Sequence, residues 1–132
     1  MKANELMVGD WICITYFDKP INAKVNEIEK YSDGHYAVCG ESIYACGDED
    51  FLPIQLTEEI MKKNRFVRKQ LMKRWIISGE LELIEDTMGN SDLEYWFSVS
   101  DQYICPIHYV HELQHALRLC GLYELADNFV VE

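Results

Sequence analysis

The stretch YVHELQHALRLCGL, residues 109–122, has the pattern of an amphipathic helix and follows a run of strand-like segments. When residues 107–120 are placed at about 100° each, apolar side chains gather on one face and polar side chains on the opposite face. The apolar face holds Tyr109, Val110, Leu113, Ala116, Leu117 and Cys120, and the polar face holds His108, His111, Glu112, His115 and Arg118. We expect this helix to begin at Pro106 and to end before Gly121, because proline suits the first helical position and glycine the position after the last.

Three segments before this helix have the pattern of an antiparallel meander. They are LMKRWIIS (71–78), ELELIED (80–86) and DLEYWFSVS (92–100), and the last two alternate apolar with polar residues. Turns are expected at Gly79 and at 88–90. The pattern therefore predicts a three-stranded sheet against which the terminal helix packs.

The first half of the chain reads as β structure. The strand-like segments are DWICITYF (10–17), INAKVNEIEKY (21–31), HYAVCG (35–40) and SIYACG (42–47). Proline and glycine in the intervening turns separate them. Four or five short strands of this kind predict either a strongly bent antiparallel sheet or a small SH3-like barrel.

A short helix is expected between the two halves. Thr57 is a good N-cap for it, and Asn64 suits a left-handed C-terminal cap. The resulting prediction is an α+β fold in a single domain, 1–132. Its β-rich N-terminal half covers 1–56, and the short helix, the meander and the amphipathic helix cover 57–132.

Charge and composition narrow the possible partners. The chain has 23 acidic and 12 basic residues, a net charge of −11, which disfavours direct binding to nucleic-acid backbones and to anionic membranes. Seven of the bases lie in KKNRFVRKQLMKR, residues 62–74, which we interpret as the solvated surface of a helix and loop or as a docking site for an acidic partner or a second copy. No apolar run reaches the roughly 18 residues of a membrane span. Because the first residues also lack the apolar run of a signal peptide, we expect a cytoplasmic protein.

The five cysteines are also consistent with a cytoplasmic protein. Their number is odd, and no two of them have the C-x-x-C spacing of a metal or redox motif. We therefore expect reduced thiols that pack as small apolar side chains.

One motif inside the terminal helix has specific chemistry. His111-Glu112-Leu113-Gln114-His115 matches H-E-x-x-H, in which two histidines one turn apart bind zinc and the glutamate activates a zinc-bound water. Under this alternative the protein is a zinc-dependent, metallopeptidase-like hydrolase, with His111 and His115 as metal ligands and Glu112 as the general base.

Other features favour a coincidental match. A catalytic zinc needs a third protein ligand, and the chain has Arg118 and Gly121 where one common extension of the motif has glycine and histidine. The fixed charge of Arg118 beside His115 would also repel a dication. We therefore predict no catalytic residue, no metal and no cofactor, and expect the polar face of the helix to be solvated.

Three stretches together resemble a known group of proteins. MKANELMVGDWI, PIQLTEEIMKKNRF and YVHELQHALRLCGL are similar to segments of a family of short proteins from Bacteroides-type gut bacteria, often found in phage or mobile-element surroundings. The resemblance implies no enzymatic activity, and in that family the helix keeps aromatic-Val-His-x-Leu-Gln while the histidine–glutamate pairing varies. The family pattern Lys-Asn-Gly-Phe differs here, because Arg65 replaces the glycine.

The resulting functional expectation is a non-enzymatic cytoplasmic protein that acts through protein contacts, as an accessory factor of a phage or mobile element. Its partner would be an unknown protein or a second copy of the chain. Besides the zinc hydrolase, a second alternative is an acidic protein that imitates nucleic acid and inhibits a nucleic-acid-binding enzyme.

Overall fold

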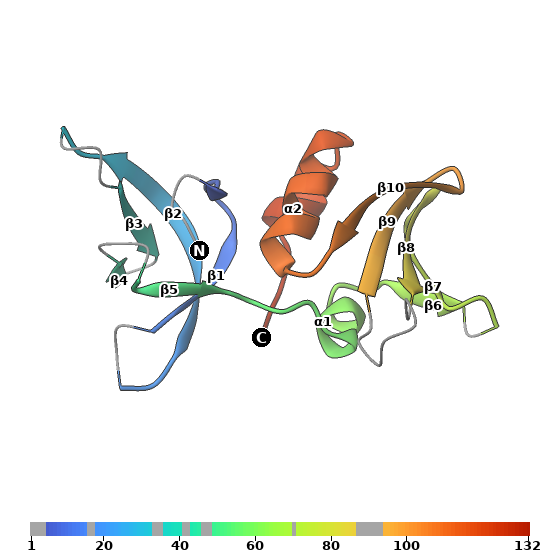
Figure 1. Cartoon of the computed structure of the whole chain (residues 1–132), viewed down its shortest axis with the longest axis horizontal. Coiled ribbons are helices and arrows are strands. Elements are labelled where there is room, and N and C mark those ends of the chain that lie inside the picture. Colours follow the sequence, from blue (N-terminus) through green and yellow to red (C-terminus); the bar gives the residue numbers. More distant parts are fainter. Residues whose placement is uncertain are drawn as a thin grey trace.

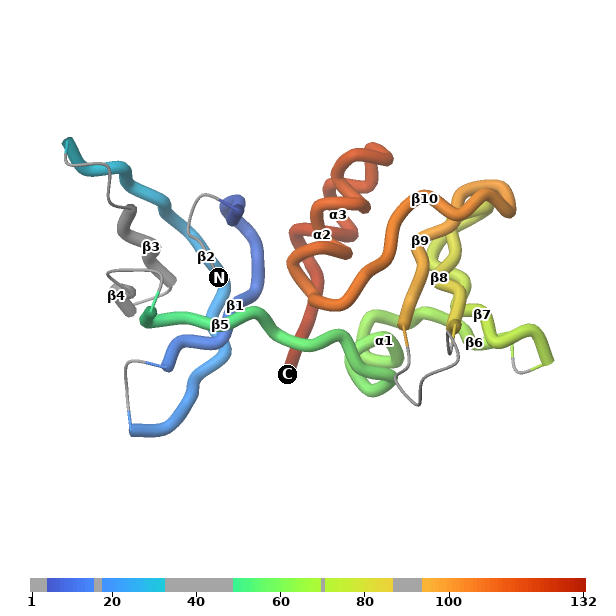
Figure 2. Tube along the Cα trace, in the orientation of Figure 1, coloured from blue at the N-terminus to red at the C-terminus, as the bar shows by residue number. Residues whose placement is uncertain are grey.

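The computed structural model describes most of the chain, with two antiparallel sheets and a helical layer between them (Figures 1 and 2). It describes residues 5–15, 18–32, 36–40, 43–45, 49–69, 71–86 and 94–132, the segments 36–40 and 43–45 by their backbone alone. The predicted α+β class is confirmed.

The first sheet has the strand order β4-β3-β2-β1-β5, and all its pairs are antiparallel. Its strands are β1 (Trp11–Ile14), β2 (Ile21–Lys30), β3 (Tyr36–Gly40), β4 (Ile43–Ala45) and β5 (Phe51–Pro53). The register of β2 against β3 shifts between Val25 and Glu27, which bends the long strand. The sheet has a hydrophobic cluster of its own, consisting of Leu6, Ile12, Ile14, Ala23, Val25 and Phe51.

The second sheet is a meander whose strands lie side by side in chain order, β10-β9-β8-β7-β6. Its strands are β6 (Val67–Lys69), β7 (Arg74–Ser78), β8 (Leu81–Asp86), β9 (Glu94–Val99) and β10 (Gln102–Ile107). The prediction of three strands is therefore wrong in number, because the two edge strands were missed. The β9–β10 turn consists of two residues, Ser100 and Asp101, both with positive φ (50° and 66°), as a type I′ hairpin turn requires.

The first two helices end in the same type of cap. In α1 (Glu58–Lys63), Arg65 has φ 64° and donates its N–H to Lys62, while the next N–H reaches Met61, as in a Schellman motif. In α2 (Val110–Leu119), Gly121 has φ 80° and occupies the equivalent position, as predicted. The prediction that Asn64 adopts the left-handed conformation is wrong, because its φ is −90° and Arg65 takes that role.

The start of α2 also differs from the prediction. Pro106 lies in β10, and the helix begins after Tyr109, its N-cap. Thr57 is the N-cap of α1 as predicted, since its side chain accepts a hydrogen bond from the Ile60 N–H. A short additional helix, α3 (Tyr123–Asp127), follows α2.

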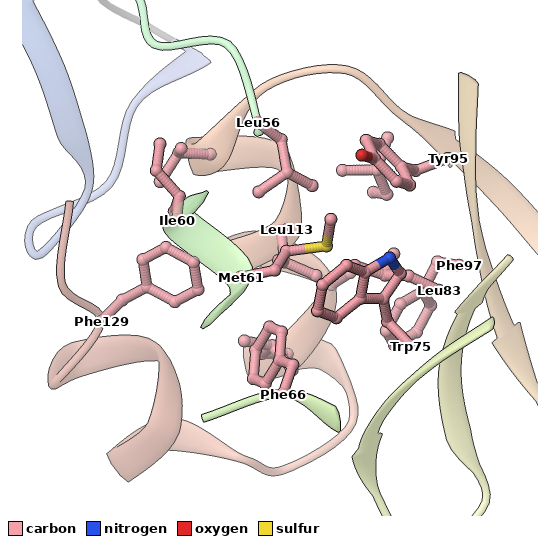
Figure 3. Packing of buried hydrophobic residues seen from close by; sticks show 14 of the residues in the cluster. Leu56, Ile60, Met61, Phe66, Trp75, Leu83, Tyr95, Phe97, Leu113 and Phe129 are labelled. Carbon is pink, nitrogen blue, oxygen red and sulfur yellow. The ribbon is translucent and has the colours of Figure 1, made fainter. Parts of the chain in front are cut away.

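The main core lies between the second sheet and the helices (Figure 3). Trp75, Leu83 and Phe97 on the sheet pack with Met61 of α1 and Leu113 of α2. The expected apolar stripe of α2 is confirmed for Val110, Leu113, Ala116 and Leu117, which are all buried, whereas Tyr109 and Cys120 are exposed. In the part of the chain that the structure describes, no helix is long and apolar enough to cross a membrane.

Candidate functional site

The polar face of α2 is solvated only in part, contrary to the expectation: the side chains of His111 and Arg118 are largely buried, whereas His108 is exposed. His111 is 6 % exposed and Gln114 is completely buried. The physical reason is the position of α2 between the two sheets, which places its polar face against the N-terminal segment and β1 (Figure 1). We call the polar contact between α2–α3 and residues 7–11 the seam.

Asp10 is the charged centre of the seam and is completely buried. Its Oδ2 lies 2.6 Å from Nε2 of His115 and accepts a 2.8 Å hydrogen bond from the N–H of Met7. Its Oδ1 accepts a 2.7 Å hydrogen bond from Nη1 of Arg118. A buried carboxylate is tolerated only when it is paired and hydrogen-bonded in this way. Asp10 therefore holds the middle of α2 to the start of the first sheet.

Gly9 permits the close approach of Arg118 to this carboxylate. Its φ is 98°, and a Cβ at this position would lie 2.7 Å from Nη2 of Arg118. Any side chain here would strain the backbone and displace the guanidinium.

Gln114 links three separate parts of the chain through backbone groups. Its Oε1 accepts the N–H of Trp11 at 3.0 Å, and its Nε2 donates to the carbonyls of Gly9 at 2.8 Å and Ala126 at 3.0 Å. The indole N–H of Trp11 in turn donates to the Phe129 carbonyl at 2.7 Å. These bonds satisfy buried polar groups and fix the position of α2 and α3 against β1.

Glu112 points to the start of its own helix. Its Oε1 accepts the backbone N–H groups of His108 and Tyr109, each at 2.9 Å. A glutamate at the third helical position that bonds back to the N-cap N–H is one half of a capping box. The glutamate of the H-E-x-x-H pattern thus satisfies N–H groups at the helix start.

His111 is buried against two neighbouring rings of the chain. Its ring stacks on Tyr109, with centroids 6.0 Å apart, and meets the ring of His115 edge-on at 5.6 Å. Burial lowers the pKa of His111, which keeps the ring neutral at pH 7. Its Nδ1 is buried and has no hydrogen-bond partner among the described residues.

The three motif residues therefore have three different surroundings. Glu112 bonds to the helix start, His115 bonds to Asp10, and His111 packs between aromatic rings. Within the described residues, no group of three or more His, Cys, Asp or Glu side chains is arranged to hold a metal ion. Arg118 lies beside His115 as expected, and the buried Asp10 compensates its charge.

Sequence reasoning missed Asp10 and Gln114, which organise the seam. Asp10 follows a glycine next to a strand, a setting that many turn residues share. Gln114 occupies one of the two variable positions of the motif, although a polar residue beside the apolar stripe could have been noticed as a candidate for burial. The thiols of Cys13, Cys105 and Cys120 are free, and burial raises the pKa of the first two.

Comparisons with known proteins add no family: no protein-family model, curated protein or solved structure matches the chain. The resemblance to short Bacteroides-type proteins therefore stays a prediction.

Proposed function

We propose that this is a non-enzymatic cytoplasmic protein that acts through protein contacts, as an accessory factor of a phage or mobile element. The observation that supports the non-enzymatic part is the position of Glu112, whose carboxylate accepts two N–H groups at the start of its own helix. A general base must instead be free to take a proton from the attacking water.

The contacts of His115, the last residue of the motif, also support a non-enzymatic role. A zinc ligand must offer an unprotonated nitrogen to the metal. Here Nε2 of His115 contacts Asp10, which also bonds Arg118. Zinc binding through this nitrogen would displace the Asp10 carboxylate from a buried network that includes its ion pair with Arg118, and such a rearrangement is costly.

A partner surface is supported at the corner between α2 and α3. Leu119 is 89 % exposed and Tyr123 is 61 % exposed. Tyr123 borders an open groove of about 830 Å³, which is lined in part by Ile77, Leu122 and Leu125. Contiguous apolar surface of this kind is typical of binding sites.

The finer fold proposal is that the first sheet is an incomplete SH3-like barrel. Its last strand, β5, returns to pair with β1, so the four-strand meander gains a fifth strand beside its first. The pairing of β5 with β1 and the bend in β2 both curve the sheet in the way that the closure of a small barrel requires.

Two measurements test this function. Metal content is measured by mass spectrometry on untagged protein dialysed against trace zinc, and we expect less than stoichiometric zinc. About one zinc per chain, together with hydrolysis that Glu112→Gln abolishes, would replace the proposal with the hydrolase alternative. Glu112→Gln suits this purpose because an amide oxygen can still cap the helix.

The contact surface is tested by photo-crosslinking in extract of the source organism. A photoreactive residue at position 123 should capture a discrete protein, whereas one at exposed Lys62 on α1 should not. Equal labelling from both positions, or from neither, would argue against a partner at the α2–α3 corner.

A further inference from the structure

An open pocket of about 610 Å³ lies beside the seam, between β2 and the end of α3. Its walls are formed by residues 22–26 of β2, by Val8, Gly9 and Trp11 next to them, and by Asp127 of α3. Small-molecule sites in proteins have volumes of about 300–1,000 Å³ and combine apolar walls with a few polar groups. The pocket therefore has the size of a ligand site, and its polar groups indicate the class of ligand.

The strand β2 lines this pocket with three polar side chains, those of Asn22, Lys24 and Asn26. They alternate along the strand with Ala23 and Val25, which are buried in the hydrophobic cluster of the first sheet. The side-chain amides of Asn22 and Asn26 form no hydrogen bond with any described part of the chain. Each amide has two donor hydrogens and an acceptor oxygen, so both are available to a ligand.

The charged groups around the pocket balance each other. The Lys24 ammonium donates a hydrogen bond to the backbone carbonyl of Asp127. The carboxylate of Asp127 lies 3.6 Å from Nη2 of Arg118, whose Nη1 is already paired with the buried Asp10. The net charge of −11 repels an anion from a distance, and the two neighbouring cations repel a cation at close range. We therefore expect a ligand without net charge.

Trp11 provides the largest apolar side chain in the wall of the pocket. It stands opposite Lys24 in the pairing of β1 with β2, and its indole N–H donates to the Phe129 carbonyl at 2.7 Å. Because this N–H is already used, the indole offers a ligand only carbon surface. The pocket thus places an apolar ring beside groups that donate and accept hydrogen bonds.

We propose that this pocket binds a neutral mono- or disaccharide. A sugar ring has C–H faces that pack on an indole, and each of its hydroxyls both donates and accepts hydrogen bonds. The two free amides and the Asp127 carboxylate match such mixed groups, whereas a phosphate or carboxylate ligand would offer them acceptors alone. The inference goes beyond the proposed function and does not rest on it, because the pocket is separate from the groove at the α2–α3 corner.

Heteronuclear NMR titrations of the isotope-labelled full chain test this proposal. The neutral sugars are glucose, xylose, N-acetylglucosamine, maltose, cellobiose and chitobiose, and the charged counterparts are glucuronate and glucosamine. We expect at least one neutral sugar to shift the side-chain amide signals of Asn22 and Asn26 and the indole signal of Trp11 in a saturable way. The side-chain signal of Asn128, an exposed asparagine outside the pocket, should not shift.

Substitutions then measure the contribution of the two amides. Asn22→Ala and Asn26→Ala should each weaken binding of that sugar about 5- to 10-fold, whereas the matched control Asn128→Ala should leave it unchanged. Since neither pocket amide bonds to the described chain, the variants should melt at the temperature of the parent protein. Absence of shifts with every neutral sugar up to about 10 mM would overturn the proposal. So would tighter binding of a charged counterpart, or binding that both pocket variants retain in full.

Discussion

Replacing Glu112 by glutamine or by alanine separates a capping role from a catalytic one. The carboxylate accepts the N–H groups of His108 and Tyr109, each at 2.9 Å. Glutamine keeps a side-chain oxygen in reach of both donors, whereas alanine leaves them to water. A general base would instead lose its function in either variant, because an amide cannot take up a proton.

The expected cost follows from these two hydrogen bonds. A hydrogen bond to a charged group contributes about 1.5–3 kcal/mol when buried, and Glu112 is partly exposed, which reduces that value. Loss of a helix N-cap interaction typically costs about 1 kcal/mol. We therefore expect Glu112→Ala to lower the free energy of unfolding by about 1–2 kcal/mol, and Glu112→Gln by about 0.5 kcal/mol or less.

Urea unfolding followed by tryptophan fluorescence measures both variants, since Trp11 and Trp75 lie at the seam and in the core. The alanine variant should also melt about 3–6 °C lower than the parent chain. Equal losses for glutamine and alanine would refute the capping argument. So would an alanine variant as stable as the parent chain.

Three further substitutions test other parts of the structure. Asp10→Ala removes a completely buried partner of His115 and Arg118 and should lower the free energy of unfolding by about 3–5 kcal/mol in urea titrations. A loss below about 1 kcal/mol would contradict the conclusion that Asp10 holds α2 to the first sheet. Arg65→Gly relieves the backbone strain of a non-glycine residue at a φ of 64° and should raise the melting temperature by about 2–4 °C. A lower melting temperature would show that contacts of the Arg65 side chain stabilise the fold by more than the strain costs. His111 should make stability fall as the pH drops below its ordinary pKa of 6.5, because the unfolded chain then takes up a proton that the buried ring resists. Urea midpoints measured at pH 7.5, 6.5 and 5.5 should fall less with decreasing pH in His111→Gln than in the parent chain. An equal fall in both proteins would exclude His111 as the cause of the pH dependence.

The parts of the fold that the sequence predicted well are those whose periodicity is complete. The alternation in residues 81–86 and 94–99 and the apolar stripe of α2 place Leu83, Tyr95, Phe97, Leu113 and Leu117 in the main core, so these patterns predict their elements correctly. The edge strands lack this property. Val67–Lys69 is only three residues long and carries two bases, and β10 contains Pro106.

Proline explains why the start of α2 was misplaced. An edge strand tolerates a missing N–H, as does the first turn of a helix, so Pro106 is compatible with both structures. The two helix C-termini show a related limit. Glycine is the usual residue at the left-handed position after a helix, so Gly121 predicts this position correctly. Arg65 adopts the same conformation in the same hydrogen-bonding motif, but an arginine does not predict it.

The polar face of α2 shows why the site could not be read from the motif alone. Amphipathicity predicts which side chains are polar, but it does not distinguish a face that meets water from one that meets another polar surface. Here each sheet has its own apolar cluster, and the contact between α2 and the first sheet is polar. That contact joins Asp10 to His115, 105 positions apart, so only the folded chain reveals it.

Three separate structural demands then account for the three specified residues of the motif. The helix start requires an acceptor at Glu112, the buried carboxylate of Asp10 requires a donor at His115, and the stacked ring of Tyr109 packs against His111. Since each demand has its own partner outside the motif, each residue should tolerate the substitution that preserves its own contact, although the rings of His111 and His115 also touch. A metal site would show the opposite behaviour, because loss of any one ligand would remove the ion that the others share.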